Sequence, residues 1–188
     1  MNREEYRKYR WFFTSNNNLV VGGKSAEQNE KLVKMIMKDK ENYVVMHTRM
    51  PGSPFAIILS KIVDARDLEE TAIWTGCFSR AWREGKRKAM IDVFTKNQIG
   101  KKKDMKSGTF GVVGNVQHKT IVLKLVLVKQ KKKLRAVPTK AVKKKDVLME
   151  IVPGKVTKQK AAEIISEKLG VDKEEVLNAL PTGGFKID

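Results

Sequence analysis

Residues 9–22 read YRWFFTSNNNLVVG, two runs of aromatic and β-branched residues on either side of a turn rich in asparagine. Aromatic and β-branched side chains favour strands, and asparagine tolerates the left-handed backbone of a tight turn. The stretch therefore predicts a β-hairpin, and it indicates that the chain opens with antiparallel strands.

A helix is expected directly after this hairpin. Ser25 begins the capping-box pattern SAEQ, and apolar residues recur behind it at helical period, so we expect a helix at about 25–38. A second helix is expected at about 67–82, where Asp67 and Glu70 repeat the capping-box spacing. Strands are expected at 43–47, 54–59, 89–94, 109–114 and 120–128. These elements predict an α+β fold: a mostly antiparallel sheet with two packed helices, plus a small C-terminal helical appendage.

Composition limits the classes of function. The chain has 188 residues, 41% of them hydrophobic, and a formal net charge of +18, which indicates a polyanionic partner. Its one cysteine, Cys77, excludes an internal disulfide or a thiolate metal cluster, so no metal or other cofactor is expected. No apolar run is long enough to span a membrane, and no charged and apolar leader follows Met1. We therefore expect a cytoplasmic protein without a membrane partner.

The positive charge is unevenly distributed along the chain. Residues 1–145 hold 33 Lys and Arg against 13 Asp and Glu, whereas residues 146–188 hold 6 against 8. The stretch 129–145 has nine Lys and Arg and no acid, which predicts an extended or mobile basic linker. The predicted division is a binding domain at 1–128, this linker, and a small helical module at 146–188.

The helical module is expected to contain a short strand followed by two helices. The strand is predicted at 147–152, and Thr157 and Asp172 are predicted caps of the two helices. The last residues, PTGGFKID, are expected to be flexible.

Several of these segments together resemble the RNA-binding (R) domain of the NFACT family. Residues 7–35, RKYRWFFTSNNNLVVGGKSAEQNEKLVKM, are similar to the opening of that domain. Further along, HTRMPGS at 47–53 resembles its histidine-containing loop, LEETAIWTGCFSRAW at 68–82 resembles a helix, and KKKDMKSGTFGVVG at 101–114 resembles a strand. The resemblance runs in order over roughly residues 7–128, which is more specific than any one motif.

This resemblance implies a function in translation. The family includes ribosome quality control factors of the RqcH and NEMF types, which engage obstructed large ribosomal subunits and tRNA. The chain resembles a stand-alone R domain with an added tail. The resemblance implies a non-enzymatic RNA-binding protein that contacts ribosomal RNA or tRNA, with the large ribosomal subunit as its expected partner.

Candidate RNA contacts lie in loops and at helix ends. Arginine forks onto phosphate and stacks on bases, and each lysine that neutralises a phosphate makes binding salt-dependent. Trp82 stands between Arg80 and Arg83, a setting suited to base stacking, whereas Trp11 and Trp74 are expected in the core. The predicted RNA-binding residues are Lys24, His47, Arg49, Arg80, Trp82, Arg83, Lys101, Lys102, Lys103 and Lys106.

Other readings stay open for some of these residues. No nucleophile or orienting carboxylate stands near His47 in the sequence, so a neutral imidazole that caps a turn and an RNA contact are both preferred to catalysis. His118 has no partner at metal-ligand spacing, and Cys77 is expected to be buried. An RNA-modifying or RNA-processing enzyme that uses His47 or Cys77, an accessory to such an enzyme, and a DNA-binding protein are the alternative functions.

Overall fold

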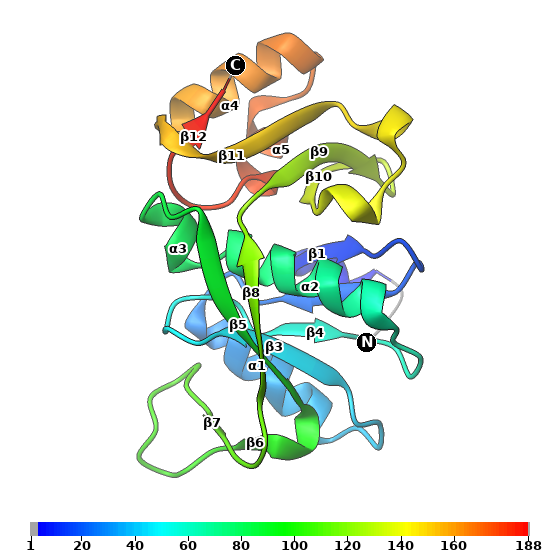
Figure 1. Ribbon diagram of the computed structural model, residues 1–188, viewed down its shortest axis with the longest axis vertical. Coiled ribbons are helices and arrows are strands. Elements are labelled where there is room, and N and C mark those ends of the chain that lie inside the picture. Colours follow the sequence, from blue (N-terminus) through cyan, green and yellow to red (C-terminus); the bar gives the residue numbers. More distant parts are fainter. Residues whose placement is uncertain (1–3, 188) are drawn as a thin grey trace.

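The computed structural model describes residues 4–187, and its largest element is a six-stranded antiparallel sheet (Figure 1). The sheet begins with the predicted hairpin, in which Trp11 pairs with Val21 and Phe12 with Val20. Asn17 lies in the turn with a φ of 60°. Across the sheet, the strands are β1 (Arg10–Phe13), β2 (Leu19–Gly22), β4 (Ala56–Ile58), β3 (Val44–Thr48), β5 (Lys88–Thr95) and β8 (Gln117–Val122).

Two helices, α1 (Ala26–Met37) and α2 (Ala65–Cys77), pack on opposite faces of this sheet. Successive side chains of a strand point to opposite faces, so Val45 packs on the α1 side and Met46 on the α2 side. The prediction of α1 is confirmed, because the Ser25 hydroxyl accepts a hydrogen bond from the backbone N–H of Gln28.

A second antiparallel sheet has four strands, and α2 lies between it and the first sheet (Figure 1). Two further helices, α4 (Lys158–Leu169) and α5 (Lys173–Ala179), begin at the predicted caps Thr157 and Asp172. In order across the sheet, the strands are β10 (Lys133–Val137), β9 (Leu125–Gln130), β11 (Met149–Val156) and β12 (Phe185–Lys186). Buried residues of both sheets and of α2 belong to one hydrophobic core, so the two sheets are packed together.

The structure contradicts an extended linker at 129–145. This segment contains the end of β9 and all of β10, which form an antiparallel hairpin. Leu134, Ala136 and Val137 are buried in the core, while the lysines of the segment are exposed. The physical reason is that successive side chains of a strand point to opposite faces. The charged side chains point outward to solvent, and the apolar ones point inward to the core. The final residues also differ from the prediction, since Phe185 is fully buried in β12.

Three predicted elements are shorter or divided in the structure. The helix expected at 67–82 begins earlier, with Asp64 as its cap, and is split into α2 and the short α3 (Arg80–Arg83), which Ser79 caps. The strand expected at 120–128 is two strands, β8 and β9, in different sheets. The strand expected at 109–114 is reduced to β7 (Gly111–Val112), which pairs with β6 (Ile99–Gly100) at the opposite end of the molecule from α4 (Figure 1).

The remaining elements are single turns of 3-10 helix. They are η1 (Glu5–Lys8), η2 (Lys96–Gln98), η3 (Thr139–Ala141) and η4 (Lys144–Asp146). Within residues 4–187, no helix has the length and apolar character that a membrane crossing requires.

Candidate nucleic-acid interface

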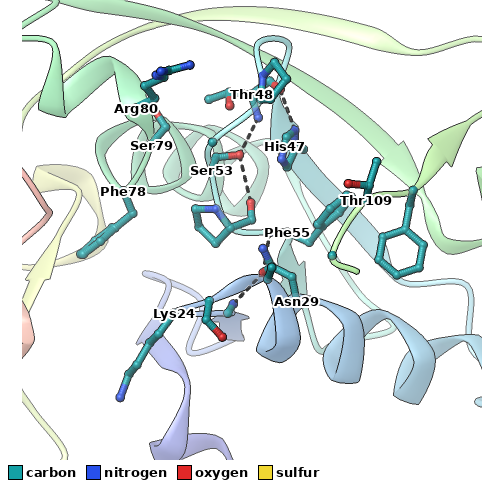
Figure 2. A pocket seen from close by; sticks show the side chains of 18 of the residues that line it. Lys24, Asn29, His47, Thr48, Ser53, Phe55, Phe78, Ser79, Arg80 and Thr109 are labelled. Atoms are coloured by element: carbon teal, nitrogen blue, oxygen red, sulfur yellow. Dashed lines mark hydrogen bonds between the residues drawn. The ribbon is translucent and has the colours of Figure 1, made fainter. Parts of the chain in front are cut away.

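A cavity of about 620 Å³ opens where the loop before α1, the loop between β3 and β4, the start of α3 and the segment 107–110 meet (Figure 2). We call it the basic groove, because five cationic side chains line it. Among its described lining residues, Asp92 is the one carboxylate. The cationic lining residues are Arg10, Lys24, Arg49, Arg80 and Arg83.

The loop between β3 and β4 is fastened by its own polar groups. The backbone N–H of Thr48 donates to the Ser53 hydroxyl at 2.9 Å, and the Thr48 hydroxyl donates to the Met50 carbonyl at 2.6 Å. Gly52, with a φ of 110°, accepts a hydrogen bond at 2.7 Å from the backbone N–H of Arg80. The loop is therefore held against α3, and Arg49 and Arg80 line the same cavity.

Asn29 joins two walls of the groove. Its side-chain oxygen accepts hydrogen bonds from the backbone N–H groups of Gly23 and Phe55, both at 3.2 Å (Figure 2). A Cβ atom on Gly23 would lie 2.3 Å from that oxygen, and one on Gly22 would lie 2.9 Å from Pro54. The two glycines are thus required for close approach of the chain, and neither has a positive φ.

His47 is partly buried in this arrangement, and its surroundings disfavour the charged form of its ring. Its Nδ1 lies 2.7 Å from the Thr48 carbonyl, which can only accept, so Nδ1 carries the proton. Its ring packs on Phe55 with a centroid separation of 4.6 Å. Burial lowers the pKa of His47, more than the Thr48 hydrogen bond and the charge of Asp92 raise it. The geometry favours a histidine that secures the turn and presents Nε2 as a hydrogen-bond acceptor, without a positive charge for phosphate.

A carboxylate does stand beside His47 in the sheet, although none is near it in the sequence. Asp92 on β5 pairs with His47 on β3 and with His118 on β8, so the three side chains share one face. His118 Nδ1 lies 2.7 Å from Asp92 Oδ1. Among residues 4–187, no group of three His, Cys, Asp or Glu side chains is placed to hold a metal ion.

The three predicted arginines are brought together and differ in their partners. Arg80 forms an ion pair with Glu84, with Nε and Oε1 3.2 Å apart, and its side chain is 58% exposed. Arg49 contacts the Met90 sulfur at 3.5 Å. Within residues 4–187, neither Arg49 nor Arg83 has a carboxylate at ion-pair distance, so both guanidinium groups are available to an external anion.

The predicted lysines 101–106 do not line the groove, and one of them is a structural residue. Lys101 Nζ donates to Glu30 at 2.7 Å and to two backbone carbonyls, and it lies over the Phe110 ring. This network fixes the segment that forms the wall at Ser107–Phe110. Lys102, Lys103 and Lys106 are exposed.

The structure contradicts base stacking by Trp82. Its side chain is fully buried, its Nε1 donates to the Gly184 carbonyl at 3.0 Å, and its ring packs on Phe185. Trp11 and Trp74 are buried as predicted. Cys77 is also buried, and this burial raises the pKa of the thiol, which disfavours a reactive thiolate at neutral pH.

Sequence reasoning missed two residues of this site. Asn29 falls in the predicted helix. Its side chain accepts hydrogen bonds from the backbone N–H groups of Gly23 and Phe55, and only the folded structure brings these groups together. Arg10 lies in the hairpin at 9–22, and its guanidinium carbon lies over the Phe78 ring, 4.8 Å from the ring centroid. Two sequence signals could have indicated Arg10: the basic residues just before the hairpin, and the alternation of side chains along β1.

Together these features define a basic α+β domain with a cationic groove whose walls are fixed by hydrogen bonds. The chain belongs to the NFACT family of RNA-binding domains: the model of the NFACT protein RNA binding domain matches residues 8–114. The residues that match this family model include most of those that line the groove, among them the loops before α1 and after β3.

Curated relatives of this chain include an archaeal Rqc2 homolog and a NEMF homolog. The chain is 30% identical to the archaeal Rqc2 homolog aRqcH of Methanocaldococcus jannaschii, over 98% of this chain and 29% of that protein. It is 35% identical to the ribosome quality control complex subunit NEMF homolog of Drosophila melanogaster, over 41% of this chain and 8% of that protein. The chain thus spans less than a third of the length of these curated relatives.

A solved structure shares the fold. The C-terminal part of the fibronectin/fibrinogen-binding protein of Streptococcus suis superposes with a TM-score of 0.51 at 19% identity, over 61% of this chain and 44% of that one. At this level of identity the likeness describes the fold alone.

Proposed function

We propose that this protein binds RNA through the basic groove, using its arginines and Lys24 as phosphate contacts, and that it acts in ribosome-associated quality control or translation. The observation that carries the proposal is the gathering of five cationic side chains around one cavity with a single carboxylate. A groove of this polarity favours a polyanion, and arginine is suited to phosphate.

The family membership and the names of the relatives support RNA as that polyanion. Ribosomal RNA or tRNA, with the large ribosomal subunit as partner and the cytoplasm as location, is the specific form of the proposal. We propose Lys102, Lys103 and Lys106 as further contacts, because they are exposed on the segment that leads into the groove wall.

We propose no catalytic role for the groove. The residues named in the enzymatic alternative do not support one, because Cys77 is buried and His47 is held by a main-chain carbonyl. An enzyme that used His47 would lose a covalent change in RNA on His47→Ala while keeping its affinity. We expect His47→Ala to produce no such loss of chemistry.

The experiment is RNA binding as a function of salt. Labelled tRNA is titrated with the protein and with the double variant Arg49→Gln/Arg83→Gln, and affinity is measured by fluorescence anisotropy at several salt concentrations. Removal of two phosphate contacts should weaken binding and reduce the salt slope by about 2. Lys143→Gln/Lys145→Gln is the matched control, since it removes two exposed charges outside the groove.

An equal effect of both double variants would contradict the groove as the binding site. Duplex DNA at the same salt tests the DNA-binding alternative. We expect structured RNA to bind more tightly than duplex DNA, and equal affinity would favour the alternative.

A further inference from the structure

A second cavity, of about 500 Å³, lies where the two sheets meet. β1, the edge strand of the first sheet, β10, the edge strand of the second, and α5 contribute to its lining. It adjoins the basic groove, because Arg10, Lys24 and Phe78 line both cavities. Residues from the hairpin at 9–22 and from the segment 129–145 therefore meet at one place.

Two guanidinium groups lie over aromatic rings in this cavity. The Arg10 guanidinium carbon lies 4.8 Å from the Phe78 centroid, and that of Arg135 lies 4.2 Å from the Trp11 centroid. Attraction to the face of an aromatic ring holds a guanidinium in place and does not use its N–H groups, which stay open to other partners.

These N–H groups lack acidic partners within the part of the chain that the structure describes. Neither Arg10 nor Arg135 has a carboxylate at ion-pair distance among residues 4–187. The Nε of Arg135 is buried and has no hydrogen-bond partner. A buried donor without an acceptor is costly, so the site is incomplete as it stands.

The cations in this region also repel one another. Burial, followed by the charge of Arg135, lowers the pKa of Arg10 to about 10. Burial and the charges of Arg10 and Arg135 lower the pKa of Lys24. Burial, with a contribution from Arg10, lowers the pKa of Lys158 to about 8. An anion placed among these groups would relieve their mutual repulsion.

Three carboxylates line the same cavity, and two of them accept hydrogen bonds from backbone N–H groups. Glu175 accepts a hydrogen bond from the Leu134 N–H at 2.7 Å and supports the charge of Arg135. Asp172 accepts one from the Glu175 N–H at 3.0 Å as the cap of α5. Glu174 is exposed. The charge that acts on Arg10 comes from Arg135, so the Arg10 side of the cavity keeps its positive character.

We propose that Arg10, Arg135 and Lys24 form a discrete site for a single phosphate group at the junction of the two sheets. The phosphate would accept from the N–H groups of both guanidinium groups and from Lys24, all three of which line the cavity. The group could come from the backbone of an RNA that leaves the groove over Arg10, or from a free phosphate-bearing ligand. The site extends beyond the proposed function, because it should take phosphate in the absence of RNA.

The test is NMR of the arginine Nε–H signals of the whole chain, titrated with inorganic phosphate and, separately, with chloride at matched ionic strength. Phosphate should shift the signals of Arg10 and Arg135 saturably, and chloride should not. The same shifts with both salts would show general screening and overturn the proposal. This measurement needs no variant, so it does not depend on a substituted protein that folds.

Variants then test the residues. Arg10→Gln should weaken phosphate binding about tenfold or more, because it removes charge-assisted hydrogen bonds. Arg10→Lys should bind with intermediate affinity, since it keeps the charge and loses the planar fork. Lys133→Gln is the matched control, a cation that lines the same cavity, and it should change affinity by about twofold or less. Phosphate binding by Arg10→Gln that equals the unsubstituted protein would overturn the assignment.

A competition experiment separates the two sources of phosphate. If tRNA displaces inorganic phosphate from Arg10 and Arg135, the site belongs to the RNA path; if both bind together, it serves a separate ligand. The site itself is supported in either case. Failure of tRNA to bind at all would contradict the proposed function and leave the phosphate titration as an independent result.

Discussion

The side-chain amide of Gln130 makes two hydrogen bonds to the main chain of Phe13, on the outer edge of β1. Its Oε1 accepts from the Phe13 N–H at 2.9 Å, and its Nε2 donates to the Phe13 carbonyl at 2.8 Å. An amide of this geometry takes the place of a neighbouring strand. The contact gives hydrogen-bond partners to the free N–H and carbonyl of an edge strand in the first sheet. Since Gln130 belongs to the second sheet, the contact connects the two sheets.

We expect Gln130→Ala to lower the free energy of unfolding by about 2 kcal/mol, because both polar groups of Phe13 would lose their partners. Urea denaturation measures the change. Lys129→Ala, an exposed neighbour on the same strand, should change the free energy by less than about 0.5 kcal/mol. Similar losses for the two variants would contradict the role of Gln130.

Gly23→Ala should lower the free energy of unfolding by about 1–3 kcal/mol, because its Cβ would overlap the side-chain oxygen of Asn29. Gly100→Ala is the control, since a Cβ there meets no atom within 4 Å. Thermal unfolding of the two variants provides the comparison. A Gly23→Ala protein as stable as Gly100→Ala would show that the groove walls do not approach as closely as described.

The hydrogen bonds of the Glu30 carboxylate make the stability of the fold depend on pH in the acid range. Its hydrogen bonds with Lys101, then with the Gly108 N–H, lower the pKa of this carboxyl to about 2 from an ordinary value of 4.5. A lowered pKa stabilises the fold above pH 4.5, and this contribution is lost as the pH falls toward 2. The amide signal of Gly108 in a pH titration should therefore have a midpoint near 2. Glu30→Gln should abolish that transition, whereas Glu27→Gln, on the exposed first turn of α1, should keep it.

The thiol of Cys77 should react only when the protein unfolds, because it is buried and its pKa is raised. Labelling with a chromogenic disulfide reagent at pH 8, with and without denaturant, measures this. A cysteine introduced by Val113→Cys, at a position that is 65% exposed, should react at once in the native state and serves as the internal reference. Rapid native labelling of Cys77 itself would reopen the enzymatic alternative.

The hairpin and α1 could be predicted because their signals are local. The turn residues, the Ser25 cap and the apolar period all lie within a few residues of the structure that they specify. The same holds for the caps of α4 and α5.

The errors come from contacts between distant parts of the chain. The basic composition of 129–145 obscured the apolar face of β10, which is buried only because β9 and α5 cover it. Trp82 is buried by Phe185, about a hundred residues later, and its arginine neighbours gave no sign of this. The proximity of Arg10 and Arg135 could not be predicted for the same reason. They lie on edge strands of two different sheets, and nothing in the sequence indicates that these strands come together.

We propose that the basic groove binds ribosomal RNA or tRNA. The most direct test is crosslinking in cells that produce the tagged protein, followed by sequencing of the attached nucleic acid, in parallel with Arg49→Gln/Arg83→Gln and Lys143→Gln/Lys145→Gln. We predict reads concentrated on ribosomal RNA and tRNA, strongly reduced in the groove variant and retained in the control variant. Scattered reads, mainly DNA, or reads unaffected by the groove variant would contradict the claim.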